Sequence, residues 1–196
     1  IEGSVWSKDA PFVGGVGMNE NERYIESVAV DEVPWHRLTT PYGRAAEFPR
    51  YFAVLKSMDD LAAVEDALCE LTINTEHQST LWHATPFAMI FLVRIFRRAR
   101  AAQADNEIAR MIAERLLEHF RLIAECVRMG EEMEHAEPLP RFSDLLREEY
   151  LWSEVYDEEA DELRWEEDDV FPADLFYSFY YYSAQVLASC EGELKQ

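Results

Sequence analysis

The side chains that could do chemistry in this sequence are five histidines and a large excess of carboxylates, 39 Asp and Glu against 18 Lys and Arg. His77 and His83 lie six positions apart in one polar stretch. A zinc site needs three or four convergent ligands, and the chain has no His-Glu-x-x-His pattern on a helix. We therefore interpret His77 as a residue that hydrogen-bonds its own turn, and we predict no metal site and no cofactor.

Covalent catalysis has no local pattern either. A Gly-x-Ser-x-Gly nucleophile elbow is missing, and Gly14-Gly15-Val16-Gly17 lacks the Lys-Ser/Thr that completes a phosphate-binding loop. The carboxylates could supply an acid–base pair, but such a pair requires a placement that sequence does not reveal. We predict that the protein is not an enzyme and has no catalytic residues. The alternative is a helical-repeat enzyme that uses His77, His83 and nearby carboxylates in a cleft.

The carboxylates are concentrated in one segment. Residues 131–169 hold 17 acidic residues and three arginines, a net charge of −14 out of −21 for the whole chain. This charge argues against a nucleic-acid ligand, whose phosphates are bound by Lys and Arg, and against anionic membrane surfaces. A cationic protein is the natural electrostatic complement.

Aromatic residues are interleaved with these carboxylates. Aromatic anchors surrounded by charge are typical of protein interfaces, where the anchors supply affinity and the charges set encounter rate and specificity. The predicted partner-binding residues are Trp152, Tyr156, Asp157, Glu158, Glu159, Asp161, Glu162, Trp165, Glu166 and Glu167. Lys substitutions at positions 158, 159, 161 and 162 should then weaken binding without unfolding the domain. The alternative is a solvated acidic loop whose tryptophans attach it to the core.

Apolar residues spaced three and four apart predict an all-α fold. The expected helices cover residues 47–58, 59–73, 86–99, 106–129 and 172–189, with a short amphipathic helix over 142–151. Thr85 is the expected N-cap of the third helix, and Gly130 is the expected residue just beyond the end of the fourth. The helix over 86–99 is apolar almost all round, so neighbouring helices must cover several of its faces.

Two short motifs lie on either side of the first two of these expected helices. Tyr42-Gly43-Arg44-Ala45 precedes them, and Glu76-His77-Gln78-Ser79-Thr80-Leu81-Trp82 follows them, leading into Ala84-Thr85-Pro86. Together these motifs resemble those of bacterial HEAT-like repeat proteins, over about residues 34–97. The resemblance implies stacked helical pairs in a compact superhelix, with an acidic irregular insertion before the C-terminal helix. Some proteins of this kind look like immunity proteins paired with secreted bacterial toxins.

The sequence thus leads to one main hypothesis, an immunity or inhibitor protein that occludes a basic bacterial toxin, such as a nuclease or another nucleotide-handling enzyme. The competing hypothesis, besides the enzyme, is a generic acidic scaffold for a cationic cytosolic partner. We expect residues 18–196 to form a single domain, and residues 1–17 to be a non-native leader or a flexible arm. We further expect a cytoplasmic protein without a membrane span, with Cys69, Cys126 and Cys190 as reduced, buried thiols.

Overall fold

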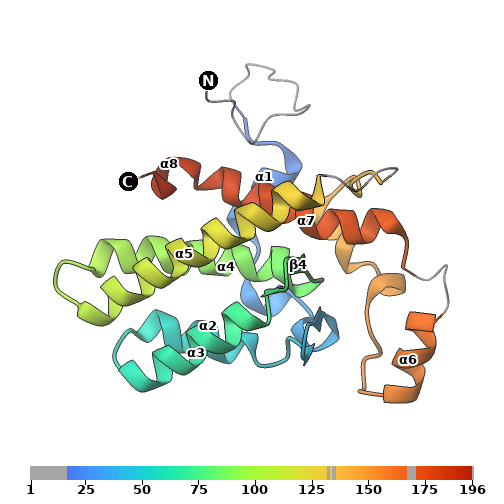
Figure 1. Ribbon diagram of the computed structural model, residues 1–196, viewed down its shortest axis with the longest axis horizontal. Coiled ribbons are helices and arrows are strands. Elements are labelled where there is room, and N and C mark those ends of the chain that lie inside the picture. Colours follow the sequence, from blue (N-terminus) through green and yellow to red (C-terminus); the bar gives the residue numbers. More distant parts are fainter. Residues whose placement is uncertain (1–16, 132, 134–135, 167–170, 196) are drawn as a thin grey trace.

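Most of the chain is helical, as the apolar spacing predicts. The computed structural model describes residues 17–131, 133, 136–166 and 171–195 (Figure 1). In chain order its elements are α1 (Glu20–Ser27), η1 (Val30–Glu32), η2 (Trp35–Arg37), β1 (Thr39–Thr40), β2 (Gly43–Arg44), α2 (Phe48–Ser57), α3 (Leu61–Ile73), β3 (Glu76–His77), β4 (Thr80–Leu81), α4 (Ala84–Ala102), α5 (Glu107–Gly130), η3 (Phe142–Leu146), η4 (Glu148–Tyr150), α6 (Glu158–Glu166), α7 (Ala173–Ser189) and α8 (Glu191–Leu194).

Helix α4 lies at the centre of the fold. Every residue from Ala84 to Val93 is buried, and so are Ile95 and Phe96. Its neighbours are α2, α5 and α7, and α5 also packs against α3 and α7. In Figure 1 the α2–α3 pair lies below α4 and α7 lies above it. The prediction that this apolar helix needs cover on several faces is therefore confirmed. None of the helices in the described part of the chain is long and apolar enough to cross a membrane.

Side-chain caps explain where two of the core helices begin. Asp60 Oδ1 accepts a hydrogen bond from the amide of Ala63 at 3.1 Å, and Asn106 Oδ1 does the same for Ala109. Each cap satisfies an amide that has no partner inside the helix. Thr85, however, lies inside α4, so its prediction as the N-cap is wrong.

Thr85 instead connects the start of α4 to the preceding hairpin. Its hydroxyl accepts a hydrogen bond from the Trp82 amide at 2.9 Å and donates to the carbonyl of Thr75 at 2.7 Å. That hairpin, β3–β4, turns at Gln78 and Ser79, whose φ angles are 49° and 66°. Both residues are in the left-handed region that a two-residue type I′ turn requires. The carboxylate of Glu76 accepts the Ser79 amide at 2.8 Å and so supports the turn.

Gly130 was predicted to follow the end of its helix, and this is wrong, because Gly130 is the last residue of α5. The glycine is required by packing. A Cβ atom at this position would lie 2.5 Å from Cδ1 of Tyr180 on α7. Tyr180 in turn receives a hydrogen bond from the Leu81 amide at 3.2 Å on its hydroxyl oxygen. The close approach therefore joins α5, α7 and the β3–β4 hairpin.

The segment after α5 also differs from its prediction. Residues 142–151 form two 3-10 turns, η3 and η4, rather than one amphipathic helix. The acidic segment expected to be irregular contains α6. Asp157 caps this helix by accepting the Ala160 amide at 3.0 Å. Acidic residues in the first turn and Arg164 in the last complement the helix dipole, so a highly charged sequence can form a helix here.

The three cysteines are free thiols. Cys126 and Cys190 are buried, and burial raises the pKa of each thiol to about 11. Cys69 is exposed on the outer side of α3, so the prediction of a buried thiol is wrong at that position. The two buried thiols behave as small apolar side chains of the core.

We predict that Gly130→Ala destabilises the fold by about 1–3 kcal/mol, because the new methyl group overpacks the Tyr180 ring. The control is Gly192→Ala in α8, where a Cβ atom meets nothing within 4 Å. That change should be neutral or stabilising by up to about 1 kcal/mol, since alanine has the higher helix propensity. Urea unfolding of both variants measures the difference. Equal stabilities would contradict the packing role of Gly130.

We also predict that two buried histidines make stability depend on pH. Burial lowers the pKa of His83 and of His119 to about 4, below the unfolded value of about 6.5. The unfolded state then binds protons first as pH falls. The contribution of the two neutral histidines to the free energy of unfolding is fully present above pH ~6.5. Acidification to pH 5 should remove about 2 kcal/mol of it per histidine.

The variant His119→Gln isolates this effect, because glutamine can still reach Thr75, whose hydroxyl lies 2.8 Å from His119 Nε2. The loss of unfolding free energy between pH 7 and pH 5 should be smaller in the variant by about 2 kcal/mol. Reading the difference between the two proteins cancels the general effect of the protein's net charge. Parallel pH profiles would overturn the assignment.

Candidate protein-binding surface

Helix α6 and the turn before it expose apolar side chains among carboxylates. Val155 is 78% exposed, Tyr156 63% and Leu163 55%. Large exposed apolar side chains that gather within one short segment are candidates for a binding site. The exposed carboxylates beside them belong to Glu158, Glu159 and Glu162. We call these six residues the α6 surface.

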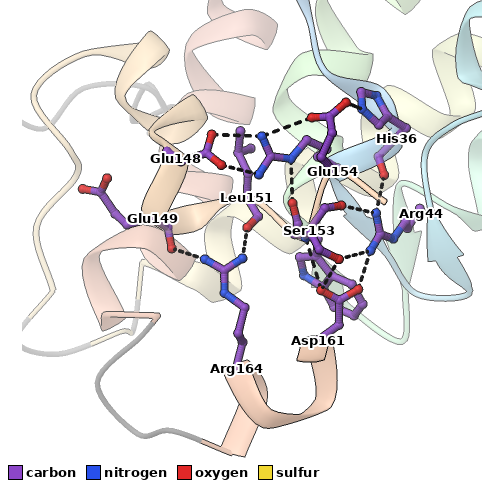
Figure 2. A network of polar contacts seen from close by, with 11 residues as sticks. His36, Arg44, Glu148, Glu149, Leu151, Ser153, Glu154, Asp161 and Arg164 are labelled. Atoms are coloured by element: carbon purple, nitrogen blue, oxygen red, sulfur yellow. Dashed lines mark hydrogen bonds and ion pairs between the residues drawn. The ribbon is translucent and has the colours of Figure 1, made fainter. Parts of the chain in front are cut away.

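The α6 surface is held in place by Arg44, at the end of β2 (Figure 2). The guanidinium of Arg44 pairs with the Asp161 carboxylate, and both side chains are almost fully buried. Arg44 also donates to the carbonyl of Ser153 at 2.7 Å and to the carbonyl of His36 at 3.0 Å. Asp161 accepts hydrogen bonds from the amide and the hydroxyl of Ser153 at 3.2 and 3.0 Å.

Two aromatic rings complete the surroundings of Arg44. The guanidinium carbon lies 5.4 Å from the ring centre of Trp152 and 5.2 Å from that of Tyr156. A cation within about 6 Å of an aromatic face is attracted by the ring quadrupole. Arg44 therefore gathers one carboxylate, several hydrogen-bond acceptors and two aromatic rings, which explains how a charged group can be buried at this position.

A second arginine, Arg37, fixes the segment that leads to α6. Its guanidinium forms a bidentate pair with Glu148 at 2.6 and 2.9 Å and donates to the carbonyl of Trp152 at 2.6 Å. The Trp152 amide donates to the Arg37 carbonyl at 3.1 Å. The hydrogen bond from Arg37 lowers the pKa of Glu148. Nearby, His36 Nε2 lies 2.7 Å from the Glu154 carboxylate (Figure 2).

Arg164 provides the third link. It donates from the last turn of α6 to the carbonyl oxygens of Leu151 and Glu149 (Figure 2). The acidic segment is thus attached at both ends of α6 by arginines, one from the N-terminal hairpin and one from the helix itself. The alternative of a solvated loop attached only through its tryptophans does not describe this arrangement.

Two of the carboxylates predicted to contact a partner have structural roles. Asp161 is only 2% exposed and pairs with Arg44, so its prediction as a surface charge is wrong. The expectation that Lys at position 161 leaves the fold intact fails with it, because a second cation would face Arg44. Asp157 is exposed but caps α6. Glu158, Glu159 and Glu162 remain as carboxylates on the surface.

The remaining predicted residues divide into two groups. Trp152 and Tyr156 contact Arg44, as described above, and Tyr156 is also well exposed. The predictions for the side chains of Trp165 and Glu166, and for Glu167, lie outside the described residues. Sequence reasoning missed Arg37 and Arg44. The sequence feature that could have indicated them was their position in an acidic chain. Arg37 lies shortly before the Tyr-Gly-Arg-Ala motif, and Arg44 lies within it.

A groove runs beside the α6 surface. It consists of three adjoining hollows with volumes of about 240, 660 and 410 Å³. The first lies between β4 and α7, and its lining includes Trp82, Phe176 and Tyr180. Thr39, Trp82 and Trp152 also line the second hollow. The third adjoins it at Gly43, Trp152 and Glu162 and reaches Tyr156 and Glu158 on the α6 side.

The two histidines considered for chemistry, His77 and His83, differ in their burial and in their hydrogen-bond contacts. His77 lies at the hairpin, where its Nδ1 is 3.3 Å from the hydroxyl of Tyr42. His83 is buried and donates from Nε2 to the carbonyl of Leu145 at 2.6 Å. Burial lowers the His83 pKa to about 4, so the ring is neutral at pH 7. In the described part of the chain, no group of three or more His, Cys, Asp or Glu side chains could hold a metal ion.

Comparisons of the chain with protein-family models, with curated proteins and with solved structures found no match.

We predict that Asp161→Ala releases α6 while the core stays folded. The variant leaves the buried Arg44 guanidinium without its carboxylate, which typically costs about 3–5 kcal/mol. Local detachment of α6 returns Arg44 to water at a lower cost in free energy than unfolding of the whole core. Amide hydrogen exchange should therefore accelerate roughly a hundredfold in residues 157–164 and remain unchanged in α4 and α5.

Glu162→Ala is the matched control, because it removes an exposed carboxylate from the same helix. Its exchange pattern should equal that of the wild type. Equal protection of α6 in the Asp161→Ala variant would show that Arg44 does not hold the helix.

Proposed function

We propose that this protein is a stoichiometric inhibitor of a cationic protein, which it binds through the α6 surface. The observation that carries the proposal is the combination of Val155, Tyr156 and Leu163, all well exposed, with three surface carboxylates on the same short segment. Apolar anchors give affinity when a partner buries them, and the carboxylates select a basic partner and accelerate encounter.

The attachment of α6 supports this proposal. An interface that is already ordered before binding loses less conformational entropy when the partner arrives. Arg44, Arg37 and Arg164 supply that order through buried or bidentate contacts. The acidic charge is thereby presented on a fixed helix rather than on a chain that must fold on contact.

The more specific part of the proposal is an immunity protein. A HEAT-like stack of helical pairs, α2–α3 and α4–α5, would form the scaffold, and a basic toxin domain in the bacterial cytoplasm would be the partner. The toxin would be a nuclease or another enzyme that grips phosphates with basic side chains. Carboxylates spaced along α6 would occupy that basic site and exclude the substrate. This mechanism requires binding only, and it predicts inhibition at equal molar amounts.

The test uses a triple variant of the α6 surface, Glu158→Gln, Glu159→Gln and Glu162→Gln. The control carries Glu65→Gln, Glu114→Gln and Glu118→Gln, which change the net charge equally at exposed positions elsewhere. Each protein serves as bait for the cytosol of the cells in which it occurs, at low and at moderate salt. We expect one basic protein to bind the wild type and the control, and to bind the α6 variant about tenfold less tightly.

A captured protein supports the proposal only if it is toxic when produced alone and harmless when an equal amount of the wild-type protein is present. Equal capture by both triple variants would show that the α6 surface is not the interface. A captured protein without toxicity would exclude the immunity function.

A further inference from the structure

The groove beside α6 changes character along its length. At one end, the hollow between β4 and α7 has aromatic walls that include Trp82, Phe176 and Tyr180. At the other end, the hollow against α6 is lined by Tyr156 and by the carboxylates of Glu158 and Glu162. The broad middle hollow, with Pro41 and Gly43 on one side, connects the two. A ligand that lies along this groove therefore contacts apolar surface at one end and negative charge at the other.

At the negative end of the groove, the described residues offer no unpaired cation that could neutralise the carboxylates. Of the described residues that line the two hollows nearest α6, Arg44 is the one cation, and it is already paired with Asp161. Among the described residues, Glu158 and Glu162 have no ion-pair partner. By contrast, the hollow between α2 and α4 is bordered by Lys56, Arg94 and Arg98. The negative rim is thus a property of this groove and not of every hollow in an acidic protein.

We propose that the groove binds an extended, cationic segment of the partner. One apolar side chain of that segment enters the aromatic hollow, and Lys or Arg side chains further along it lie against Glu158 and Glu162. The inference rests on the proposed function in one respect, since the segment belongs to the protein that the α6 surface binds. It adds the chemistry, the direction and the anchor of the segment that is recognised.

The size of the aromatic hollow suits one side chain of a peptide better than a whole small molecule. The aromatic hollow, at about 240 Å³, is below the range of roughly 300–1,000 Å³ that encloses drug-sized ligands. It accommodates a single side chain. The middle hollow is larger, about 660 Å³, and its lining of Thr39, Thr40, Pro41 and Gly43 suits a passing backbone.

The two ends should contribute differently. An apolar anchor buried against aromatic rings is the kind of contact that dominates binding energy. Exposed ion pairs contribute about 1 kcal/mol or less each, so the carboxylates mainly fix the direction of the segment and increase the rate of encounter. Loss of the anchor should therefore weaken binding more than loss of one basic residue.

The experiment selects binders for the full chain from a random-sequence peptide library. We expect the selected peptides to share an apolar residue on one side of Lys or Arg. One such peptide is then measured in two double-mutant cycles. The first pairs its anchor→Ala change with Phe176→Ala, and the second pairs its Lys→Ala or Arg→Ala change with Glu162→Gln. Phe176→Leu keeps the wall apolar, and Glu114→Gln on α5 is the charge control.

Anchor truncation and Phe176→Ala should each weaken binding about tenfold, and together they should weaken it little further. Phe176→Leu should retain most of the affinity. The basic residue should couple to Glu162 and not to Phe176, and Glu114→Gln should change nothing. Selected peptides without a basic residue, or cycles in which neither pair couples, would overturn the inference. Coupling of the basic residue to Phe176 would overturn the proposed direction.

The same variants separate this inference from the proposed function. If a toxic partner is neutralised equally by the wild type, Phe176→Ala and Glu162→Gln proteins, the groove inference fails while the inhibitor function stands. If the peptides bind with the expected coupling but the captured partner is not toxic, the groove inference stands and the immunity function fails.

Discussion

The fold depends on the burial of α4. A helix with apolar residues on nearly all sides cannot remain exposed to water, because each large apolar side chain loses about 1.5–3 kcal/mol when it is left unburied. The three helices α2, α5 and α7 provide the cover, and each is amphipathic enough to present one apolar face. Elements before and after α4 in the chain pack against it. The β1–β2 hairpin and helix α7 therefore both lie close to α4.

This packing around α4 also positions the α6 surface. The β1–β2 hairpin places Arg44 beside the acidic segment, although more than a hundred residues separate Arg44 from Asp161. The guanidinium is buried, so it requires a carboxylate, and Asp161 is the carboxylate that reaches it. This pair and the hydrogen bonds of Arg164 to the carbonyls of Leu151 and Glu149 set which side of α6 faces inward. Val155, Tyr156 and Leu163 are consequently left on the surface together with Glu158, Glu159 and Glu162.

The acidic segment therefore performs two tasks with one type of residue. Asp157 and Asp161 build the segment, one as a helix cap and one as a buried counter-charge. The glutamates carry the charge that a partner would meet. The division follows from position: Asp157 lies within reach of the Ala160 amide and Asp161 within reach of the Arg44 guanidinium, whereas Glu158, Glu159 and Glu162 are exposed to solvent. Charge count alone could not separate the two groups.

The sequence by itself determined the helical class, the approximate bounds of α2, α3, α4, α5 and α7, and the concentration of charge after α5. These properties depend on local periodicity and composition, which act within a few residues. Only the tertiary structure decided the roles of Arg44, Asp161 and Gly130. Each of these roles depends on a neighbour far away in the chain, the carboxylate for Arg44 and the Tyr180 ring for Gly130. The left-handed conformation of Ser79 is local by contrast, because the two-residue turn between β3 and β4 requires it and the Glu76 carboxylate accepts the Ser79 amide.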